Sequence, residues 1–261
     1  MLQPALFVGH GSPMNALLEN EYARSLRELG RTLPRPKAVA VVSAHWMTRG
    51  TRVSCQPSLR QIHDFYGFPA ELYSIRYRPP AAPGVARRAV GLLREVAPDV
   101  SCDDGWGLDH AGWTVLLRLF PGADVPVFVI SVDVEAPAPK HLALARTLLP
   151  LREEGVLVLG SGNVVHNLWE ADLGNMNAPP DPRGVAFDRK VARAVEDGDL
   201  TALANYGDWG EEARFSVPTP DHYLPLLWVA ALRPPGDRVT FPYEGFQNRA
   251  VSMRAVRVGS P

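Results

Sequence analysis

The sequence has little of several features that mark particular classes of protein. It has only two cysteines, Cys55 and Cys102, and they stand in no metal-binding or redox spacing. We therefore expect both to be reduced thiols, as is usual in a cytoplasmic protein. The formal net charge is only −1, so no electrostatic argument favours nucleic acid or an anionic membrane as a partner.

Long hydrophobic runs are also missing. No stretch of the sequence approaches the ~18 consecutive apolar residues that a membrane-spanning helix needs. The first residues lack a basic segment followed by an apolar one, so we expect no secretion signal and a cytoplasmic location.

The remaining composition is that of an ordinary globular protein. Of the 261 residues, 46% are hydrophobic and 21% are charged, which is enough apolar material for a well-buried core. This length fits one large domain or two small ones. The 25 prolines are scattered and not gathered in a linker, and no internal repeat is present. We therefore expect a single domain over residues 1–261.

Short apolar runs rich in β-branched residues alternate with segments of helical periodicity. The predicted strands cover residues 5–9, 38–44, 125–132, 155–161, 238–243 and 252–258. The predicted helices cover residues 20–33, 84–97, 110–120, 138–154, 184–204 and 222–232. Nearly continuous apolar strands indicate burial on both faces, and the alternation predicts a three-layer α/β/α sandwich. The last two strands have no helix between them, so we expect an antiparallel pair and a mixed, largely parallel sheet.

Two of the seven histidines come directly at the end of predicted strands. His10 follows the first strand in FVGHGSP, and His45 follows the second in KAVAVVSAHW. In open α/β sheets, ligands bind beyond the carboxyl ends of the strands. We therefore expect these two histidines to meet at one edge of the sheet, with the glycines beside His10 allowing a sharp turn.

Three further histidines stand near predicted helix starts. His110 follows a candidate N-cap, Asp109, and His166 falls in the first turn of a helix capped by Asn163. His222 lies close to a helix that begins either at Pro220 or nearer Pro225. The positive end of a helix dipole disfavours imidazolium, so these side chains are expected to be neutral, the form that binds a metal or accepts a proton.

Together, four histidines predict a metal site, although no compact signature such as H-E-x-x-H is present. These are His10, His45, His166 and His222. We expect structural roles for the other two, His63 and His141, the latter at a surface position of a helix. The sequence contains no G-x-S-x-G, no dinucleotide fingerprint and no P-loop.

The motifs in order resemble one known family over essentially the whole chain. They are GHGSP at 9–13, SAHW at 43–46, IHDFYGFP at 62–69, GLDHAGW at 107–113, SGNVVHNL at 161–168 and TPDHYLPLL at 219–227. Together they resemble the 4,5-DOPA extradiol dioxygenases, which are type III extradiol ring-opening dioxygenases related to the protocatechuate 4,5-dioxygenase catalytic subunit. The resemblance implies an α/β/α fold and one divalent metal per chain, with Fe(II) for activity and Zn(II) often found on purification.

Residue by residue, the resemblance implies roles for five histidines. His10, His45 and His222 would hold the metal. His166 would be the catalytic acid/base and a possible fourth ligand, and His110 would line the pocket and assist catalysis. The substrate class would be a catechol such as DOPA, opened with O₂ to a muconic semialdehyde-type product.

One departure leaves the native metal open. The protocatechuate-type relatives use two histidines and a carboxylate, a set typical of non-haem Fe(II), whereas His222 stands at the third position here, with Asp221 beside it. An all-histidine set also suits zinc. A zinc-dependent hydrolase of a small substrate using the same histidines is therefore the alternative function, and a non-catalytic zinc-binding protein is a second.

Aromatic side chains beside the motif histidines are expected either to hold the substrate ring or simply to belong to the core. They are Trp46, Phe65, Tyr66, Trp113 and Tyr223. Arg49 is one candidate partner for a substrate carboxylate. Glu244 is a candidate contact for an amino or hydroxyl group, with an ordinary solvated loop as the preferred interpretation.

Overall fold

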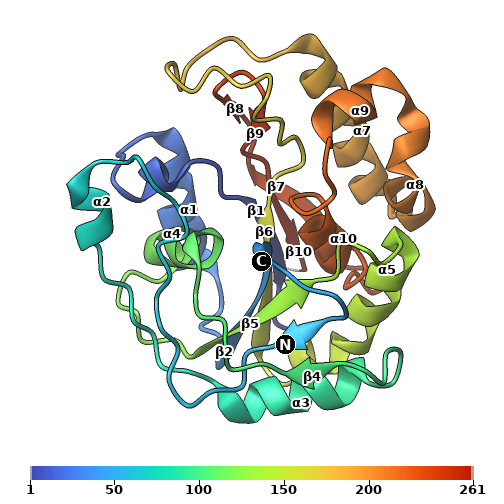
Figure 1. Cartoon of the computed structure of the whole chain (residues 1–261). Coiled ribbons are helices and arrows are strands. Elements are labelled where there is room, and N and C mark those ends of the chain that lie inside the picture. The colour runs from blue at the N-terminus through green and yellow to red at the C-terminus, as the bar shows by residue number, and fades with distance from the viewer. Residues whose placement is uncertain (1, 260–261) are drawn as a thin grey trace.

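The computed structural model describes residues 2–259, and the fold is a mixed sheet with helices on both faces (Figure 1). The strands are β1 (Ala5–Gly9), β2 (Ala38–Met47), β3 (Arg52–Val53), β4 (Ser101–Cys102), β5 (Val127–Val132), β6 (Val156–Gly162), β7 (Val239–Tyr243), β8 (Phe246–Gln247), β9 (Val251–Ser252) and β10 (Ala255–Val258). The helices are α1 (Glu21–Thr32), α2 (Ala70–Ser74), α3 (Pro83–Leu93), α4 (His110–Leu119), α5 (Ala138–Thr147), α6 (Leu149–Glu153), α7 (Pro182–Asp197), α8 (Leu200–Ala204), α9 (Glu211–Ser216) and α10 (Leu224–Ala230), with 3-10 turns η1 (Pro13–Ala16) and η2 (Tyr206–Trp209).

The main sheet has the strand order β4-β3-β5-β2-β6-β1-β10-β7. Its centre is parallel, with β2 between β5 and β6, and β6 beside β1. At one side β10 pairs antiparallel with both β1 and β7, which confirms the predicted antiparallel pair and the mixed, largely parallel sheet. The parallel centre sends the carboxyl ends of β1, β2 and β6 to the same edge.

The sheet is buried on both faces because alternate side chains of each central strand enter different cores. In β1, Leu6 and Val8 belong to the core that includes residues of α1 and α4, whereas Phe7 belongs to the core that includes residues of α3, α5, α7 and α10. In Figure 1, α1, α2 and α4 lie on one side of the sheet and α5 and α7–α10 on the other. The expected three-layer α/β/α sandwich is confirmed, as one compact unit.

Two predicted helices are interrupted. The helix expected over 138–154 divides into α5 and α6 at Leu148, and Pro150 stands in the first turn of α6, where a missing backbone N–H is tolerated. The helix expected over 184–204 divides at Gly198, whose φ of 71° ends α7 in the left-handed conformation. Asp199 then caps α8 by accepting a hydrogen bond from the Ala202 backbone N–H at 2.9 Å.

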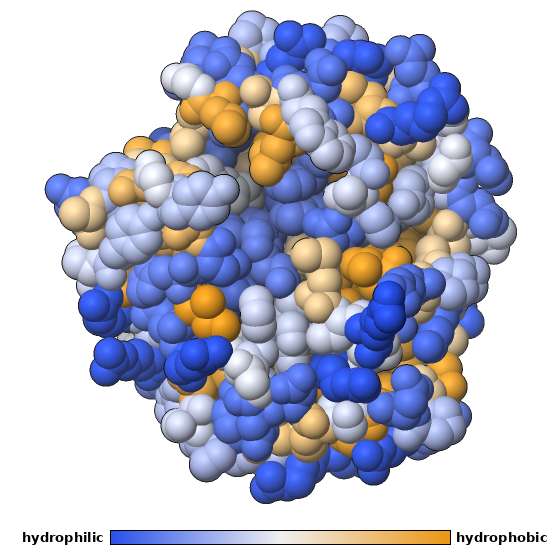
Figure 2. All heavy atoms as spheres, viewed as in Figure 1, coloured by the Kyte–Doolittle hydropathy of each residue, from blue (hydrophilic) through white to orange (hydrophobic). Residues whose placement is uncertain are grey.

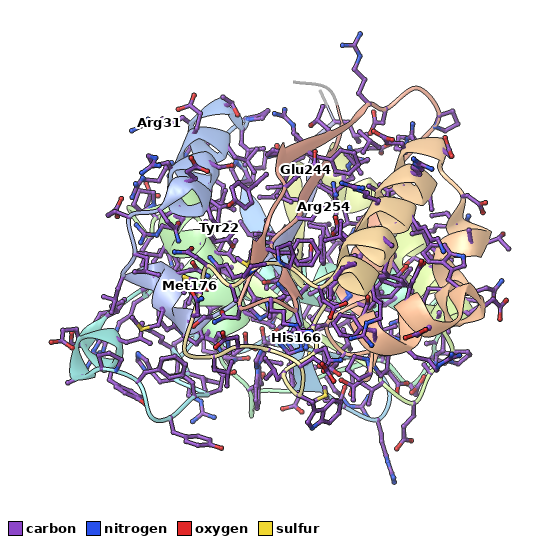
Figure 3. The ribbon with its side chains drawn as sticks, turned by 90° about the horizontal axis from the view of Figure 1, so that it is seen from above. Tyr22, Arg31, His166, Met176, Glu244 and Arg254 are labelled. Carbon is purple, nitrogen blue, oxygen red and sulfur yellow. A yellow bond between two sulfur atoms is a disulfide. The ribbon has the colours of Figure 1, made fainter. Side chains whose placement is uncertain are left out.

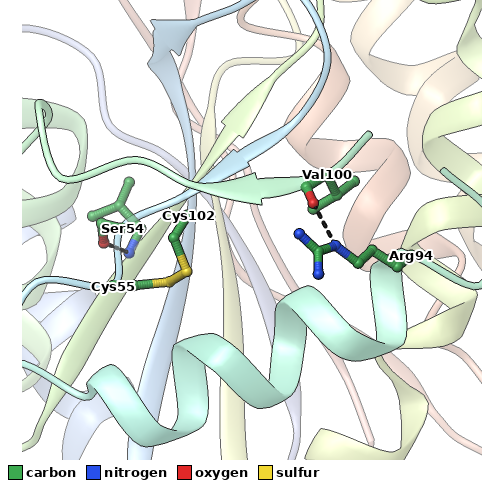
Figure 4. The surroundings of a disulfide bond; sticks show 6 residues. Ser54, Cys55, Arg94, Val100 and Cys102 are labelled. Atoms are coloured by element: carbon green, nitrogen blue, oxygen red, sulfur yellow. Dashed lines mark hydrogen bonds between the residues drawn. A yellow bond between two sulfur atoms is a disulfide. The ribbon is translucent and has the colours of Figure 1, made fainter. Parts of the chain in front are cut away.

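The prediction of two reduced thiols is wrong for this structure, because Cys55 and Cys102 form a disulfide (Figure 4). The short strands β3 and β4 pair in parallel, with Val53 opposite Cys102, so Cys55 lies beside its partner although 47 residues separate them in sequence. The pairing depends on two strands too short to be visible in the sequence pattern. Among residues 2–259, no helix has both the length and the apolar character needed to cross a bilayer.

Candidate metal centre and active site

Two strand ends deliver the first two histidines as expected. His10 follows β1 directly, and Gly11 continues the chain with a φ of 58°, a turn that favours glycine. His45 lies near the end of β2, where the pairing with β5 becomes irregular between Ser43 and Met47. The Nε2 atoms of His10 and His45 face each other at 3.3 Å.

The third histidine comes from the loop before α10. This helix begins at Leu224 with Pro225 in its first turn, so the later of the two predicted starts is correct and His222 precedes the helix. The His222 carbonyl accepts a hydrogen bond from the Asn163 backbone N–H at 2.9 Å. A Cβ at Gly162 would lie 2.1 Å from this carbonyl oxygen, so the end of β6 must be glycine for His222 to approach.

The three imidazoles form a nearly equilateral triangle. The ring centroids are 5.1 Å apart for His10–His45, 5.2 Å for His10–His222 and 5.1 Å for His45–His222. One nitrogen of each lies within 4.8 Å of the others. This separation suits three nitrogen ligands that share one ion, with metal–nitrogen distances of about 2.0–2.1 Å.

Each ring has an oxygen partner on its outer nitrogen. His10 Nδ1 lies 3.2 Å from Ser161 Oγ, whose own proton is donated to the Ala111 carbonyl at 2.6 Å. Ser161 can therefore only accept from His10, which places the proton of His10 on Nδ1. His222 Nδ1 likewise donates to the carboxylate of Asp221.

His45 Nδ1 lies 3.0 Å from Asp64 Oδ2 and completes the pattern. With the proton on Nδ1, each ring would present the lone pair of Nε2 to a cation at the centre of the triangle. Carboxylate or hydroxyl partners of this kind fix the tautomer and orientation of metal-binding histidines.

The donor set fits a divalent cation. His222 Nε2 is buried and has no hydrogen-bond partner among the described residues. Two facing Nε2 atoms, those of His10 and His45, need either a proton or a cation between them. The carboxylates of Asp64 and Asp221 lie directly behind two of the rings, so the charge of a divalent ion would be balanced although the inner ligands are neutral.

The protonation properties of the rings follow from burial and from these carboxylates. Burial and the other histidines hold the pKa of His10 well below its ordinary value, and burial lowers the pKa of His222 to about 4. Burial also lowers the pKa of His45, but the carboxylates of Asp64, Asp109 and Asp221 outweigh it and raise the pKa above its ordinary value.

His110 lies beside the triangle. It is the first residue of α4, and its predicted N-cap, Asp109, accepts a hydrogen bond from the Gly112 backbone N–H, as expected. The His110 ring centroid is 4.1 Å from that of His45 and 5.4 Å from that of His10. His45, Asp64 and His110 form a second group with mutually close ligand atoms.

His166 reaches the site by a different route from the predicted one. No helix begins at Asn163; the chain bends at residues 164–165, His166 forms a bridge with Val251, and its backbone N–H donates to the Ser216 carbonyl at 2.9 Å. The backbone of this segment pairs with residues that are distant in the sequence, so the local sequence pattern could not reveal this arrangement. The His166 ring stacks on that of His222, with centroids 3.5 Å apart and planes 5° apart.

A cavity of about 280 Å³ opens beside this stack. Its walls are His166, Leu168, Trp169, Pro218, Thr219 and Asp221. Trp169 is 77% exposed, and Leu168 and Leu173 are also exposed hydrophobic side chains of this segment. Figure 2 shows this face hollowed over the middle of the molecule, with hydrophilic residues inside the hollow and hydrophobic residues along its upper rim.

The five aromatic residues singled out from the sequence differ in where they lie: one is at the site, three are in the core and one is exposed. Phe65 lies at the site, with its ring centroid 5.6 Å from that of His110. Trp46, Trp113 and Tyr223 are buried core residues, and Tyr66 is 92% exposed.

The two charged candidates lie in ion pairs. Arg49 contacts Glu135 at 2.8 Å and its side chain is 86% exposed. Glu244 contacts Arg254 at 2.9 Å, and Figure 3 shows this pair away from His166.

His141 is not a surface residue, and that prediction is wrong. Its side chain is buried between α5 and α10, where Trp228 Nε1 donates to its Nδ1 at 3.1 Å and its Nε2 lies 3.0 Å from the Asp133 carbonyl. The half-buried His63 ring lies 5.5 Å from that of Trp113 and 5.7 Å from that of Phe65, between centroids. The structural role expected of His63 stays a prediction.

Sequence reasoning did not assign Asp64 or Ser161 to the site. Both stand inside the quoted motifs IHDFYGFP and SGNVVHNL. Their contacts with His45, His110 and His10 join segments far apart in the chain, so only the folded structure reveals them.

Comparison with known proteins agrees with the fold. Residues 5–235 match the family described as the catalytic LigB subunit of aromatic ring-opening dioxygenase. A 4,5-DOPA dioxygenase extradiol of Escherichia coli K12 is 44% identical over 263 residues, covering 98% of this chain and 94% of that protein. A protein of the same name from Beta vulgaris is 33% identical, covering 86% and 85% of the two chains.

A crystal structure of an uncharacterized Escherichia coli K12 protein has the same fold. Its TM-score is 0.84 at 40% sequence identity, with 98% of this chain and 100% of that chain covered. The protein is accordingly an oxidoreductase of the aromatic ring-opening dioxygenase class. It belongs to the LigB family of these dioxygenases, which decides against the hydrolase and the non-catalytic zinc protein.

Proposed function

We propose that this protein opens the ring of a catechol such as DOPA beside its two hydroxyl groups, with O₂ as co-substrate and a muconic semialdehyde-type product. The names of its relatives, 4,5-DOPA dioxygenases extradiol, support this substrate class. The observation that carries the proposal is the convergence of three Nε2 lone pairs, from His10, His45 and His222, each backed by an oxygen partner on Nδ1.

These three histidines would hold one divalent metal. Bound Fe(II) would supply the redox chemistry that lets O₂ react with a catechol and would favour the deprotonated form of the hydroxyl groups. The same nitrogen set also suits Zn(II), so we expect zinc to compete for the site and to leave it inactive toward O₂.

His166 would move the proton. It stands against His222, borders the cavity, and belongs to neither group of mutually close ligand atoms. Burial, followed by the charge of His222, holds the pKa of His166 well below its ordinary value, so the ring is neutral and able to accept a proton from a substrate hydroxyl. It would return that proton later in the reaction. A place as a fourth ligand of zinc would compete with this role.

The cavity and its rim would accept the aromatic ring. Phe65 on the His110 side and Trp169 on the His166 side offer flat apolar surfaces. The walls would also keep bulk water from the reacting oxygen atoms. His110, whose ring lies beside those of His45 and His10, would contact the substrate oxygens.

The test of the reaction class is the fate of the oxygen atoms. Protein reloaded with Fe(II) under anaerobic conditions is mixed with DOPA and ¹⁸O₂, and the product is analysed by mass spectrometry before it cyclises or exchanges. We expect a ring-opened product that contains both oxygen atoms of one O₂. Loss of the catechol without incorporation of labelled oxygen would contradict the proposal.

A further inference from the structure

A cavity of about 390 Å³ lies apart from the one beside His166, and the two share no lining residue. Three arginines line it, together with three other polar side chains: Arg60, Arg76, Arg78, Gln61, His63 and Tyr73. Its lining contains no aspartate and no glutamate. The charged side chains of this arginine cavity therefore all have the same sign.

Two of the arginines face the cavity because the residue between them belongs to the core. Tyr77 is 2% exposed, and its hydroxyl group donates to the Phe120 carbonyl at 3.0 Å. Its backbone N–H donates to Gln61 Oε1 at 2.9 Å, which joins two walls of the cavity. Arg76 and Arg78 stand on either side of this buried residue, and both are directed to the cavity instead of the core.

The three guanidinium groups of the arginine cavity form no ion pair among residues 2–259. Arg60 donates to the Gly105 carbonyl at 2.8 Å, and Arg76 donates to the carbonyls of Tyr73 and Ile75 at 2.6 and 3.0 Å. These carbonyls accept a few of the five N–H groups that each guanidinium carries, and they leave its charge uncompensated. All three arginines are exposed, so a ligand can reach them from solvent.

Another arginine-lined cavity of the protein shows the opposite arrangement. It has a volume of about 320 Å³, and each of its four arginines forms an ion pair with a carboxylate. These pairs are Arg27 and Arg118 with Glu19, Arg31 with Glu28, and Arg35 with Asp124. The protein thus supplies the counter-charge in that cavity, whereas in the arginine cavity it has to come from a ligand.

The positive charge of the arginine cavity also acts on His63. Burial, followed by the charge of Arg76, holds the pKa of His63 below its ordinary value. The neutral ring adds a polar group to the wall without adding a further charge. An anion bound in the cavity would offset the repulsion among the three guanidinium groups.

We propose that the arginine cavity binds a small molecule that carries a phosphate group, with Arg60, Arg76 and Arg78 as its principal contacts. A tetrahedral phosphate offers oxygen atoms in several directions, so three guanidinium groups at separate positions can contact it together. A planar monocarboxylate is satisfied by one guanidinium and would leave the other two without a counter-charge. The volume lies within the range of about 300–1,000 Å³ that is usual for small-molecule sites. This site goes beyond the proposed function and does not depend on it.

The test measures the binding of inorganic phosphate to the full-length, metal-free protein by isothermal titration calorimetry. Without metal, phosphate cannot bind through an ion in the histidine site. At about pH 8 and constant ionic strength, phosphate is mostly a dianion and ordinary histidines are neutral. We expect saturable binding to the wild type. Arg76→Gln/Arg78→Gln should weaken it by at least about tenfold, because both charge-assisted contacts are lost.

The other arginine-lined cavity provides the matched control. Arg31→Gln/Arg35→Gln also removes two positive charges from exposed positions. Since both arginines already have carboxylate partners, we expect this variant to change the affinity for phosphate by less than about twofold. Urea unfolding of both double variants verifies that each is folded.

Three results would overturn the inference. The first is the absence of saturable phosphate binding to the wild-type protein. The second is equal weakening in the two double variants, which would mean general charge attraction and an adventitious ion only. The third is binding of succinate as tight as that of phosphate, which would assign the cavity to dicarboxylates and not to a phosphate group.

Discussion

His166 and His222 stack face to face, with their ring centroids 3.5 Å apart and their planes 5° apart. Two imidazolium ions could not coexist at this distance without strong repulsion, and burial adds to that cost. The stack therefore keeps a neutral ring against the proposed metal ligand. It also fixes the position of His166 without using either of its nitrogen atoms in the contact.

The stack leads to a prediction about the acid/base step. We expect His166→Ala to retain the metal, because His10, His45 and His222 form the ligand group without His166. Turnover should fall by about 10²–10⁴-fold, the range typical of a general acid/base. Metal content by elemental analysis and steady-state rates with DOPA check both statements.

His166→Phe separates the two possible contributions of the ring. Phenylalanine preserves a flat ring beside His222 but has no nitrogen. We expect it to be as inactive as His166→Ala. Near-normal turnover in either variant would show that His166 does not move the proton, and recovery in His166→Phe alone would assign it a packing role.

The disulfide predicts a change in stability. Cys55 and Cys102 connect the beginnings of the segments that lead to Asp64 and to His110. Closing a loop of this length stabilises a protein by about 2–4 kcal/mol through the unfolded state. Cys55→Ser/Cys102→Ser should lower the free energy of unfolding by that amount, measured with urea in the absence of reductant.

The thiol count provides the control for this prediction. Wild-type protein purified without reductant and then denatured should show no free thiols in a colorimetric titration. Two free thiols per chain, together with equal stability of the double serine variant, would show that the bond is not formed under those conditions.

The buried His141 predicts a dependence of stability on pH. Burial lowers its pKa below 6.5, and the Trp228 N–H occupies the lone pair that a proton would need. The unfolded chain binds this proton first as the pH falls. The stabilising contribution is therefore complete above about pH 6.5 and is lost as the pH falls through the native pKa.

Comparison with His141→Gln isolates this contribution from those of the other histidines. In the same metal state, the difference in unfolding free energy between wild type and variant should be about 1–3 kcal/mol at pH 7.5. It should shrink toward pH 5.5. A difference that stays constant over this range would contradict a neutral, hydrogen-bonded His141.

The sequence predicted the parts of the fold that depend on local pattern. The central strands have strong apolar runs, and β1 was placed at residues 5–9, as found. Their parallel arrangement brings His10 and His45 to one edge, and both were expected there. The missed elements are short: β3 and β4 have two residues each, too few for a periodic pattern.

The errors concern contacts between distant segments. The chain around His166 bonds to Ser216 and Val251, so it cannot form the local helix that its glycine turn suggested. His141 was expected at the surface of its helix, yet its side chain is buried and hydrogen-bonded to Trp228. Asp64 and Ser161, which contact the site histidines, were missed for the same reason. Nothing in the local sequence distinguishes them from other polar residues in a loop or at a strand end.

Oxygen uptake tests the central claim most directly. The protein is stripped of metal, reloaded anaerobically with Fe(II), and mixed with air-saturated buffer and DOPA in an oxygen electrode. We predict uptake of one O₂ for each DOPA consumed, with a new yellow absorbance, and no uptake with His10→Ala treated in the same way. Wild-type protein that holds Fe(II) but consumes no oxygen with DOPA or with a small panel of catechols would contradict the account.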